Sequence, residues 1–268
     1  MNKIFAFTIL FAFAITSCQR VPLTGRKQFV AFSSNQMQTM SYTQYSQFMN
    51  QNKPITGTAD AQMVKKVGQR IANAVTSYLQ SKNLGSRVQG FKWEYNLVKS
   101  PEANAWCMPG GKIAVYTGIL PITKTEAGLA AVMGHEVAHA IAKHGNERMS
   151  KSAGINLLGA AGSVALSSKN PQQVDLFNQA FGVTSQMGML AFSRKHELEA
   201  DEMGMIFMAK AGYNPQEAIN LWKRMAAASK GQKPPEFMST HPHEATRIKA
   251  LEKVLPKANI YYRPGNRN

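Results

Sequence analysis

The sequence carries two histidines and a glutamate in the pattern His-Glu-x-x-His at residues 135–139. They stand inside a long apolar run (126–144) that predicts a buried helix. Residues four apart share one face of a helix, so His135 and His139 can bind one Zn²⁺ at about 2.0–2.1 Å. Glu136 lies about 100° round the helix from His135, where it can take a proton from an attacking water without binding the metal.

The alternative interpretation of this pattern is a pair of core histidines satisfied by ordinary hydrogen bonds. Two imidazoles and a carboxylate in an apolar helix are costly to bury unless they serve a purpose. We therefore expect one Zn²⁺ per chain, with His135 and His139 as ligands and Glu136 as general base. Zinc catalysis also needs a third protein ligand and one open position.

Candidates for the third ligand lie in the segment Ser193-Arg194-Lys195-His196-Glu197-Leu198-Glu199-Ala200-Asp201. Glu197 and Asp201 again share a helix face, so Glu197 can bind the metal while Asp201 accepts the free N–H of a ligand histidine. Glu199, on another side of this helix, is expected to face solvent or a basic neighbour, and His196 is a poorer ligand candidate. The alternative, a solvated acidic face, fits poorly with the small and apolar residues that follow.

A third group of candidates is Ser239-Thr240-His241-Pro242-His243. From a loop, His241 could stabilise the oxyanion that develops on a scissile carbonyl. It could instead occupy the open zinc position and hold the site inactive, or it could be an ordinary turn residue. We expect His144 and His243 to be surface histidines.

The remaining pattern predicts an α+β fold that is mostly helical, with a small sheet ahead of the helices. Helices are expected at 36–52, 60–79 and 246–254, from Pro215, over 153–166, and over 174–211 with breaks near Gly182 and Gly188. Strict alternation over 91–97 predicts a strand. The runs 104–108 and 112–117 flank a Pro-Gly-Gly turn and predict a hairpin or a pair of edge strands.

The amino-terminal segment has the layout of a secretory signal. A short positive start precedes an apolar run that is too short to span a bilayer, and Ile15-Thr16-Ser17-Cys18 follows. This end resembles a bacterial lipobox, which predicts acylation of Cys18 and a lipid anchor in the membrane. An ordinary signal peptide or a buried apolar helix is the alternative. We expect a signal peptide at 1–17, a tether at 18–35, the catalytic domain at 36–256 and a loose tail at 257–268.

Charge and cysteine content limit the partners. The chain carries 31 Lys and Arg against 15 Asp and Glu, a net charge of +16. The positive charges are scattered and no nucleic-acid motif accompanies them, so we expect a solvated basic surface or attraction to an anionic membrane, and no nucleic acid. With Cys18 acylated, Cys107 has no partner, which predicts a fold without a disulfide.

Taken together, HEVAH, SRKHELEAD and STHPHEATRI resemble the gluzincin metallopeptidases, in the group that contains the CAAX prenyl endopeptidase and HtpX. Two further segments, Val21-Pro22-Leu23-Thr24-Gly25-Arg26 and Asn104-Ala105-Trp106 with Pro109-Gly110-Gly111, look like the opening and the cleft segment of its exported lipoprotein members, such as BepA and LoiP. The resemblance covers about residues 20 to 255. It implies a zincin-type domain in which a helix carries the His-Glu-x-x-His motif beside a small edge sheet.

The same resemblance implies roles for individual residues. Glu197 becomes the third ligand, Asp201 lies behind a histidine, and His241 lies near the metal as a functional residue. Asn104, Ala105 and Trp106 are expected to border the cleft, where an extended substrate pairs by strand addition. Cys107 departs from the family's apolar residue and is either an inhibitory zinc ligand or a small buried thiol.

The resulting expectation is a zinc endopeptidase that cleaves unfolded or misassembled cell-envelope proteins, from an outer-membrane anchor facing the periplasm. Gln19 after the cysteine, by resemblance to bacterial sorting rules, favours the outer membrane. One rival is a chaperone-like lipoprotein that holds unfolded strands in the same cleft without cleaving them. A second rival is a metallohydrolase that acts on cell wall or another amide. The oligomeric state is left open.

Overall fold

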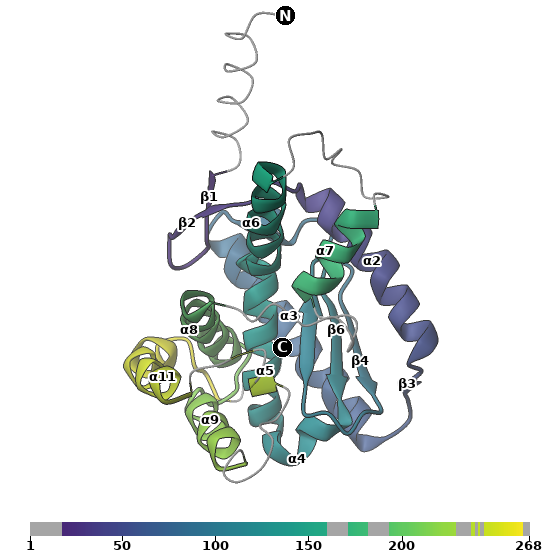
Figure 1. The fold of residues 1–268 in the computed structure, drawn as a ribbon. Helices are drawn as coiled ribbons and strands as arrows, with labels where there is room; N and C mark the ends of the chain where they lie inside the picture. The colour runs from purple at the N-terminus through teal and green to yellow at the C-terminus, as the bar shows by residue number, and fades with distance from the viewer. Residues whose placement is uncertain are drawn as a thin grey trace, which may run out of the picture.

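The computed structural model describes residues 18–159, 171–181, 193–228, 237–238, 241 and 244–264 (Figure 1). Its strands are β1 (Cys18–Arg20), β2 (Lys27–Phe29), β3 (Pro54–Ile55), β4 (Glu94–Val98), β5 (Ala105–Met108) and β6 (Lys112–Tyr116). Its α-helices are α2 (Ser34–Gln51), α3 (Ala59–Ser81), α4 (Leu120–Thr123), α5 (Glu126–Ile141), α6 (His144–Gly159), α7 (Pro171–Phe181), α8 (Arg194–Lys210), α9 (Gln216–Ala228) and α11 (Glu244–Asn259).

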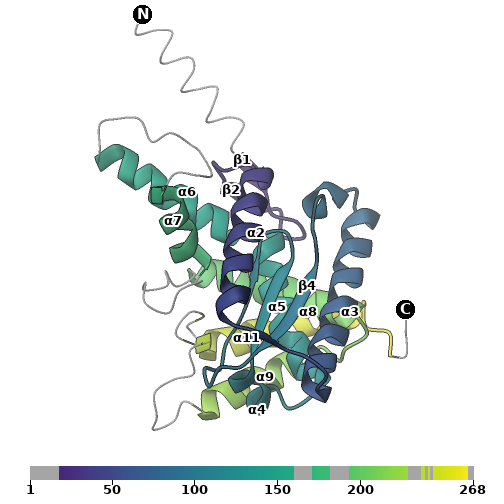
Figure 2. The same ribbon diagram turned by 90° about the vertical axis from the view of Figure 1, so that its right-hand side faces the viewer.

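A four-stranded mixed sheet separates two apolar clusters. The strand order is β3-β4-β6-β5, with β4 parallel to β6 and the other pairs antiparallel. Because side chains alternate across a strand, Ala105 and Cys107 of β5 face the large cluster with α3 and α5, whereas Trp106 and Met108 face α2. Figure 2 shows α2 in front of the sheet, with α5 and α8 behind it.

The central helix α5 begins where Thr125 accepts a hydrogen bond from the Gly128 amide, a standard N-cap arrangement. Every residue of α5 from Gly128 to Ile141 is buried, because β5, α3, α8 and α9 surround it. The helices α8, α9 and α11 gather on the side of α5 away from the sheet (Figure 1). This helix therefore lies in the middle of the molecule, which explains its apolar sequence.

Two glycines bring α5 and α8 into backbone contact. A Cβ on Gly134 would lie 2.9 Å from the Gly204 carbonyl oxygen, and one on Gly204 would lie 2.8 Å from the His135 nitrogen. Both distances are shorter than packed carbon atoms allow, so each position requires glycine. The close approach places the amino-terminal turns of α8 beside the His-Glu-x-x-His turn.

Several predicted elements are confirmed with shifted ends. The hairpin is β5–β6, and α3 covers the helix predicted over 60–79. The apolar helix ends at Ile141, before 144, because Lys143 adopts a positive φ of 59° and His144 opens a new helix. The last helix continues to Asn259, and buried Ala258 anchors the first residues of the expected tail.

The expected tether is the clearest difference. The range 18–35 contains β1 and β2, paired antiparallel, and it contributes buried Val21, Val30 and Phe32 to the core. The sequence hid this because two three-residue strands are too short to show periodicity.

Some expectations lie outside the described residues. They are the signal segment 1–17, residues 160–166, the breaks near Gly182 and Gly188, and the neighbours of His241 in its loop. Within the described part of the chain, no helix is both long and apolar enough to cross a membrane.

Candidate metal centre

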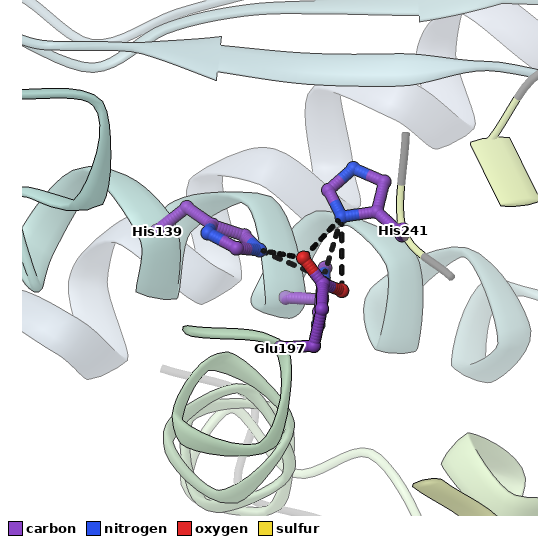
Figure 3. Close-up of side chains that lie close together, drawn as sticks. His139, Glu197 and His241 are labelled. Atoms are coloured by element: carbon purple, nitrogen blue, oxygen red, sulfur yellow. Dashed lines mark hydrogen bonds and ion pairs between the residues drawn. The ribbon is translucent and has the colours of Figure 1, made fainter. Parts of the chain in front are cut away.

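Four buried side chains from three parts of the chain converge on one point. Figure 3 shows three of them, His139, Glu197 and His241. The Nε2 atoms of His135 and His139 lie 3.0 Å apart, and Glu197 Oε1 lies 3.5 Å from His139 Nε2. His241 Nδ1 lies 3.0 Å from Glu197 Oε1 and 3.3 Å from His135 Nε2. One ligand atom from each residue lies within 4.8 Å of all the others.

This donor set fits one zinc ion. Imidazole nitrogen and carboxylate oxygen are both zinc ligands, and four of them correspond to tetrahedral coordination. All four residues are at most 4% exposed. Without a cation, lone pairs would face one another in a site that water barely reaches. The predicted trio His135, His139 and Glu197 is therefore brought together, and the structure adds His241 as a fourth donor.

The far side of His135 lies against Asp201. Its Nδ1 atom lies 3.1 Å from Asp201 Oδ1, which leaves Nε2 to face the metal position. Such a contact fixes the tautomer and the orientation of a ligand histidine. Asp201 is 5% exposed, and the pKa of its carboxyl is lowered, because Arg247 and His135 outweigh the effect of burial.

The residue that sequence reasoning missed here is Arg247 of α11. It donates to both carboxylate oxygens of Asp201, at 2.7 and 2.6 Å, and its Nη1 lies 2.7 Å from Glu197 Oε2. Its guanidinium stacks on Trp222, 3.6 Å from the ring centre, and the residue is 1% exposed. Nothing in the sequence separated it from the neighbouring exposed lysines of the same helix.

The far side of His139 differs from expectation. Its Nδ1 atom lies 2.9 Å from Nδ1 of His144, which was expected at the surface but is fully buried. His144 Nε2 in turn lies 2.9 Å from Glu199 Oε2. Glu199 was expected to face solvent or a basic neighbour, and the second expectation is confirmed. Its Oε2 atom lies 2.7 Å from Nε of Arg26.

Glu136 is placed to act as a base. It is 3% exposed, and its Oε1 has no hydrogen-bond partner within the described residues, although His241 Nε2 lies 3.4 Å away. Burial raises the pKa of its carboxyl, while the neighbouring imidazoles of His241 and His135 oppose this. A raised pKa suits a group that must take up a proton and release it again.

Cys107 behaves as a small buried thiol. Burial raises its pKa well above the usual value, and the negative charge of Glu136 raises it further. Its Sγ donates weakly to the Met108 carbonyl at 3.6 Å. A neutral thiol is a poor zinc ligand, so the alternative of an inhibitory thiolate finds no support in these contacts.

The predicted substrate-binding residues lie on and next to β5, the edge strand of the sheet. Asn104 and Ala105 are buried beside the metal-bearing helix. The Trp106 side chain points to the opposite face, where its ring lies 5.0 Å from that of Phe48. Because the Tyr116 N–H donates to the Asn104 carbonyl, the antiparallel alternation turns the backbone of Trp106 toward β6 and that of Ala105 away from it.

A buried His-Glu-x-x-His helix, completed by a glutamate from a second helix, defines the class of HExxH metallopeptidases. The model of peptidase family M48 matches residues 59–255, and the chain belongs to this family. The expected gluzincin membership and the zincin-type fold are thereby confirmed.

Individual relatives agree with this family membership. The chain is 41% identical to the mitochondrial metalloendopeptidase OMA1 of Schizosaccharomyces pombe over 179 residues, which are 65% of this chain and 50% of that protein. It is 32% identical to OMA1 of Saccharomyces cerevisiae over 263 residues, 93% of this chain and 72% of that protein. The β-barrel assembly-enhancing protease of Escherichia coli is 29% identical over 182 residues, 65% of this chain and 37% of that protein.

These relatives bear on the expected position within the family. The chain spans half of the S. pombe protein. Both mitochondrial and bacterial proteins are similar to it. Its sequence identity to the E. coli protein, 29%, is lower than that to the S. pombe protein, 41%. The comparison therefore supports membership in the family. Membership in its exported lipoprotein branch is a proposal.

Arg247 gives a direct test of this electrostatic arrangement. Arg247→Met should lower the free energy of unfolding of the chelator-treated protein by about 3–5 kcal/mol, because buried Glu197 and Asp201 lose their cation. Urea unfolding measures the change. The control on the same helix is Lys257→Met, which removes a solvent-exposed pair with Glu202 and should cost about 0–1 kcal/mol. Equal losses in the two variants would contradict the described role of Arg247.

Proposed function

We propose that this protein is a zinc-dependent endopeptidase. The observation that carries the proposal is the buried cluster of His135, His139, Glu197 and His241 with the buried Glu136 carboxylate beside it. Membership in a peptidase family supports it. A pure binding module would have no use for Glu136, which argues against a chaperone-like role for the same cleft.

The chemistry divides between the metal and the chain. Zinc, when bound, polarises the scissile carbonyl and acidifies water. Glu136 takes the proton from the attacking water and returns it to the leaving amine, so that the C–N bond breaks without a charged amide leaving group. Asp201, through its contact with Nδ1, holds the His135 ring in the orientation that directs Nε2 toward the metal.

The proposed substrates are unfolded or misassembled proteins of the cell envelope. An extended segment can pair with β5, which lies at one edge of the sheet in the described residues, and such pairing requires a chain that has lost its own structure. The name of the E. coli relative, a β-barrel assembly-enhancing protease, is consistent with such substrates. Cell-wall amides are less well matched, because a strand edge recognises a peptide backbone.

The catalytic assignment predicts that Glu136→Gln keeps zinc and loses proteolysis. Gln has nearly the same volume but cannot accept the proton, so cleavage of casein should fall about 10²–10⁴-fold. Zinc content by metal analysis should stay at one per chain. A chelator should abolish cleavage by the wild-type protein, and added zinc should restore it. Undiminished cleavage by Glu136→Gln would contradict the mechanism.

In the described conformation His241 blocks the site. Its ring lies among the metal ligands, and its backbone N–H donates to Phe237, whose own N–H donates to the Ala103 carbonyl at 3.0 Å. Phe237 also stacks on His241, with ring centres 4.5 Å apart. His241 thus occupies the fourth metal position, and Phe237 binds the carbonyl just before β5. Of the two roles open to His241, the contacts favour the inhibitory one.

His241→Ala should therefore speed casein cleavage, because the fourth position becomes open to water and substrate. Initial rates with the fully zinc-loaded proteins measure the effect. The double variant Glu136→Gln/His241→Ala is the control and should be inactive. If His241→Ala instead lowered the rate by about 10²-fold or more, His241 would stabilise the oxyanion and the inhibitory role would be wrong.

We further propose that the protein is an exported lipoprotein, anchored through Cys18 to the outer membrane and facing the periplasm. The signal-like segment and the position of Cys18 at its end support this. Expressed in a Gram-negative bacterium, the protein should incorporate radioactive palmitate and sediment with outer membranes. Cys18→Ser should abolish both, whereas Cys107→Ala, which removes the other of the two cysteines, should change neither. An unlabelled wild-type protein would rule out the anchor.

A further inference from the structure

We propose that Arg26, Glu199 and His144 form a positioning chain that orients the zinc ligand His139. The inference rests on the proposed zinc site and assigns to it a segment near the amino terminus, in the loop between β1 and β2. None of these three residues touches the metal position itself. They act on it through the far side of one imidazole.

Zinc binding through one ring nitrogen fixes the tautomer of a histidine, and the tautomer decides which atoms donate the hydrogen bonds. A histidine that binds zinc through Nε2 carries its proton on Nδ1, so His139 must donate from Nδ1. The acceptor 2.9 Å away is Nδ1 of His144, which therefore carries its own proton on Nε2. That proton is donated to Glu199 Oε2, also at 2.9 Å. Each step admits one tautomer only, so the chain transmits orientation from Glu199 to His139.

Arg26 fixes the carboxylate at the end of this chain. Its Nε donates to Glu199 Oε2 at 2.7 Å, and the Thr24 hydroxyl donates to Oε1 of the same carboxylate. Both oxygens of Glu199 are thus held by the β1–β2 loop, from more than 170 residues away in the sequence.

A second set of contacts restrains His144 through stacking on the face of its ring. The other end of the Arg26 guanidinium pairs with Glu147, with Nη2 2.8 Å from Oε2. Glu147 Oε2 lies 3.1 Å from His196 Nε2. The His196 ring stacks on that of His144, with centres 4.3 Å apart and planes 17° from parallel. Arg26 therefore restrains His144 both through its hydrogen bond to Glu199 and through its stacking neighbour.

The arrangement parallels the one behind the other ligand histidine. His135 is backed by the pair Asp201–Arg247, and His139 by the pair Glu199–Arg26 with His144 inserted between. In both, a buried carboxylate needs its arginine, because an unpaired charge in such surroundings is strongly unfavourable. Loss of Arg26 should therefore loosen the orientation of His139, although Arg26 lies outside the zinc site.

The test is the zinc dissociation constant, measured by competition with a chromophoric chelator. His144→Phe removes the bond to His139, and Arg26→Ala removes the support of Glu199. Each should weaken zinc binding about 10–100-fold, the range for partners of ligand histidines. The double variant should bind zinc no more weakly than His144→Phe, because Arg26 acts through His144. Arg26→Lys, which keeps the charge but only part of the hydrogen bonding, should fall between wild type and Arg26→Ala.

A second readout does not depend on activity or affinity. In the zinc-loaded protein the Nδ1 proton of His139 should give a slowly exchanging imidazole signal in the proton NMR spectrum. Its exchange with solvent should be faster in Arg26→Ala. The control is Arg224→Ala, which removes an arginine paired with Glu217 far from these residues in the sequence and should leave zinc affinity and this signal unchanged.

The outcomes separate the two proposals. A wild-type protein that binds no zinc would defeat the proposed metal site. A wild-type protein that binds zinc, with Arg26→Ala equally tight and its imidazole signal unaltered, would defeat the positioning chain alone. Should His144→Phe not fold, the series of wild type, Arg26→Lys and Arg26→Ala still decides the question.

Discussion

The backbone contact between α5 and α8 is the constraint on which the rest of this structure depends. Zinc bonds of about 2 Å require that Glu197 approach two histidines on another helix to within a few ångströms. Only glycine at 134 and 204 permits this, because a Cβ at either position would collide with the opposite backbone. The apolar packing around the two helices then makes the geometry of the ligand atoms rigid.

The same close packing creates an electrostatic difficulty. Glu136, Glu197 and Asp201 are all buried beside two ligand histidines, and charges in such a place need partners. Zinc supplies part of the compensation and Arg247 supplies another part, from a helix more than 40 residues further along the chain. This explains why α11, which contributes no metal ligand, packs against α8. Its buried arginine completes the charge balance that lets α5 carry polar residues through an apolar core.

Substrate access depends on the turn that holds Phe237 and His241. A metal centre built for catalysis must keep one coordination position exchangeable, yet here an imidazole from a separate segment occupies that position. Phe237 donates to the Ala103 carbonyl and stacks on His241, and the His241 carbonyl accepts a hydrogen bond from Arg247. An extended peptide that pairs with β5 would compete for the same edge. The proposed pairing of a peptide with β5 would therefore require Phe237 and His241 to move.

The sequence by itself determined the chemistry, because helical periodicity is local. The spacing of His135, Glu136 and His139 predicted a zinc site. The i, i+4 relation of Glu197 and Asp201 predicted a third ligand and the partner of a ligand histidine. It also determined the fold class, since long amphipathic helices and an alternating strand show in pattern alone. Only the tertiary structure decided what surrounds those groups. His144, Glu199, Arg26 and Arg247 look like surface residues in a sequence, and their burial results from contacts across 46 to 173 residues that no local pattern encodes. The physical reason is that a charge is inexpensive in water and costly in a core, so its role depends on the partner that folding brings to it.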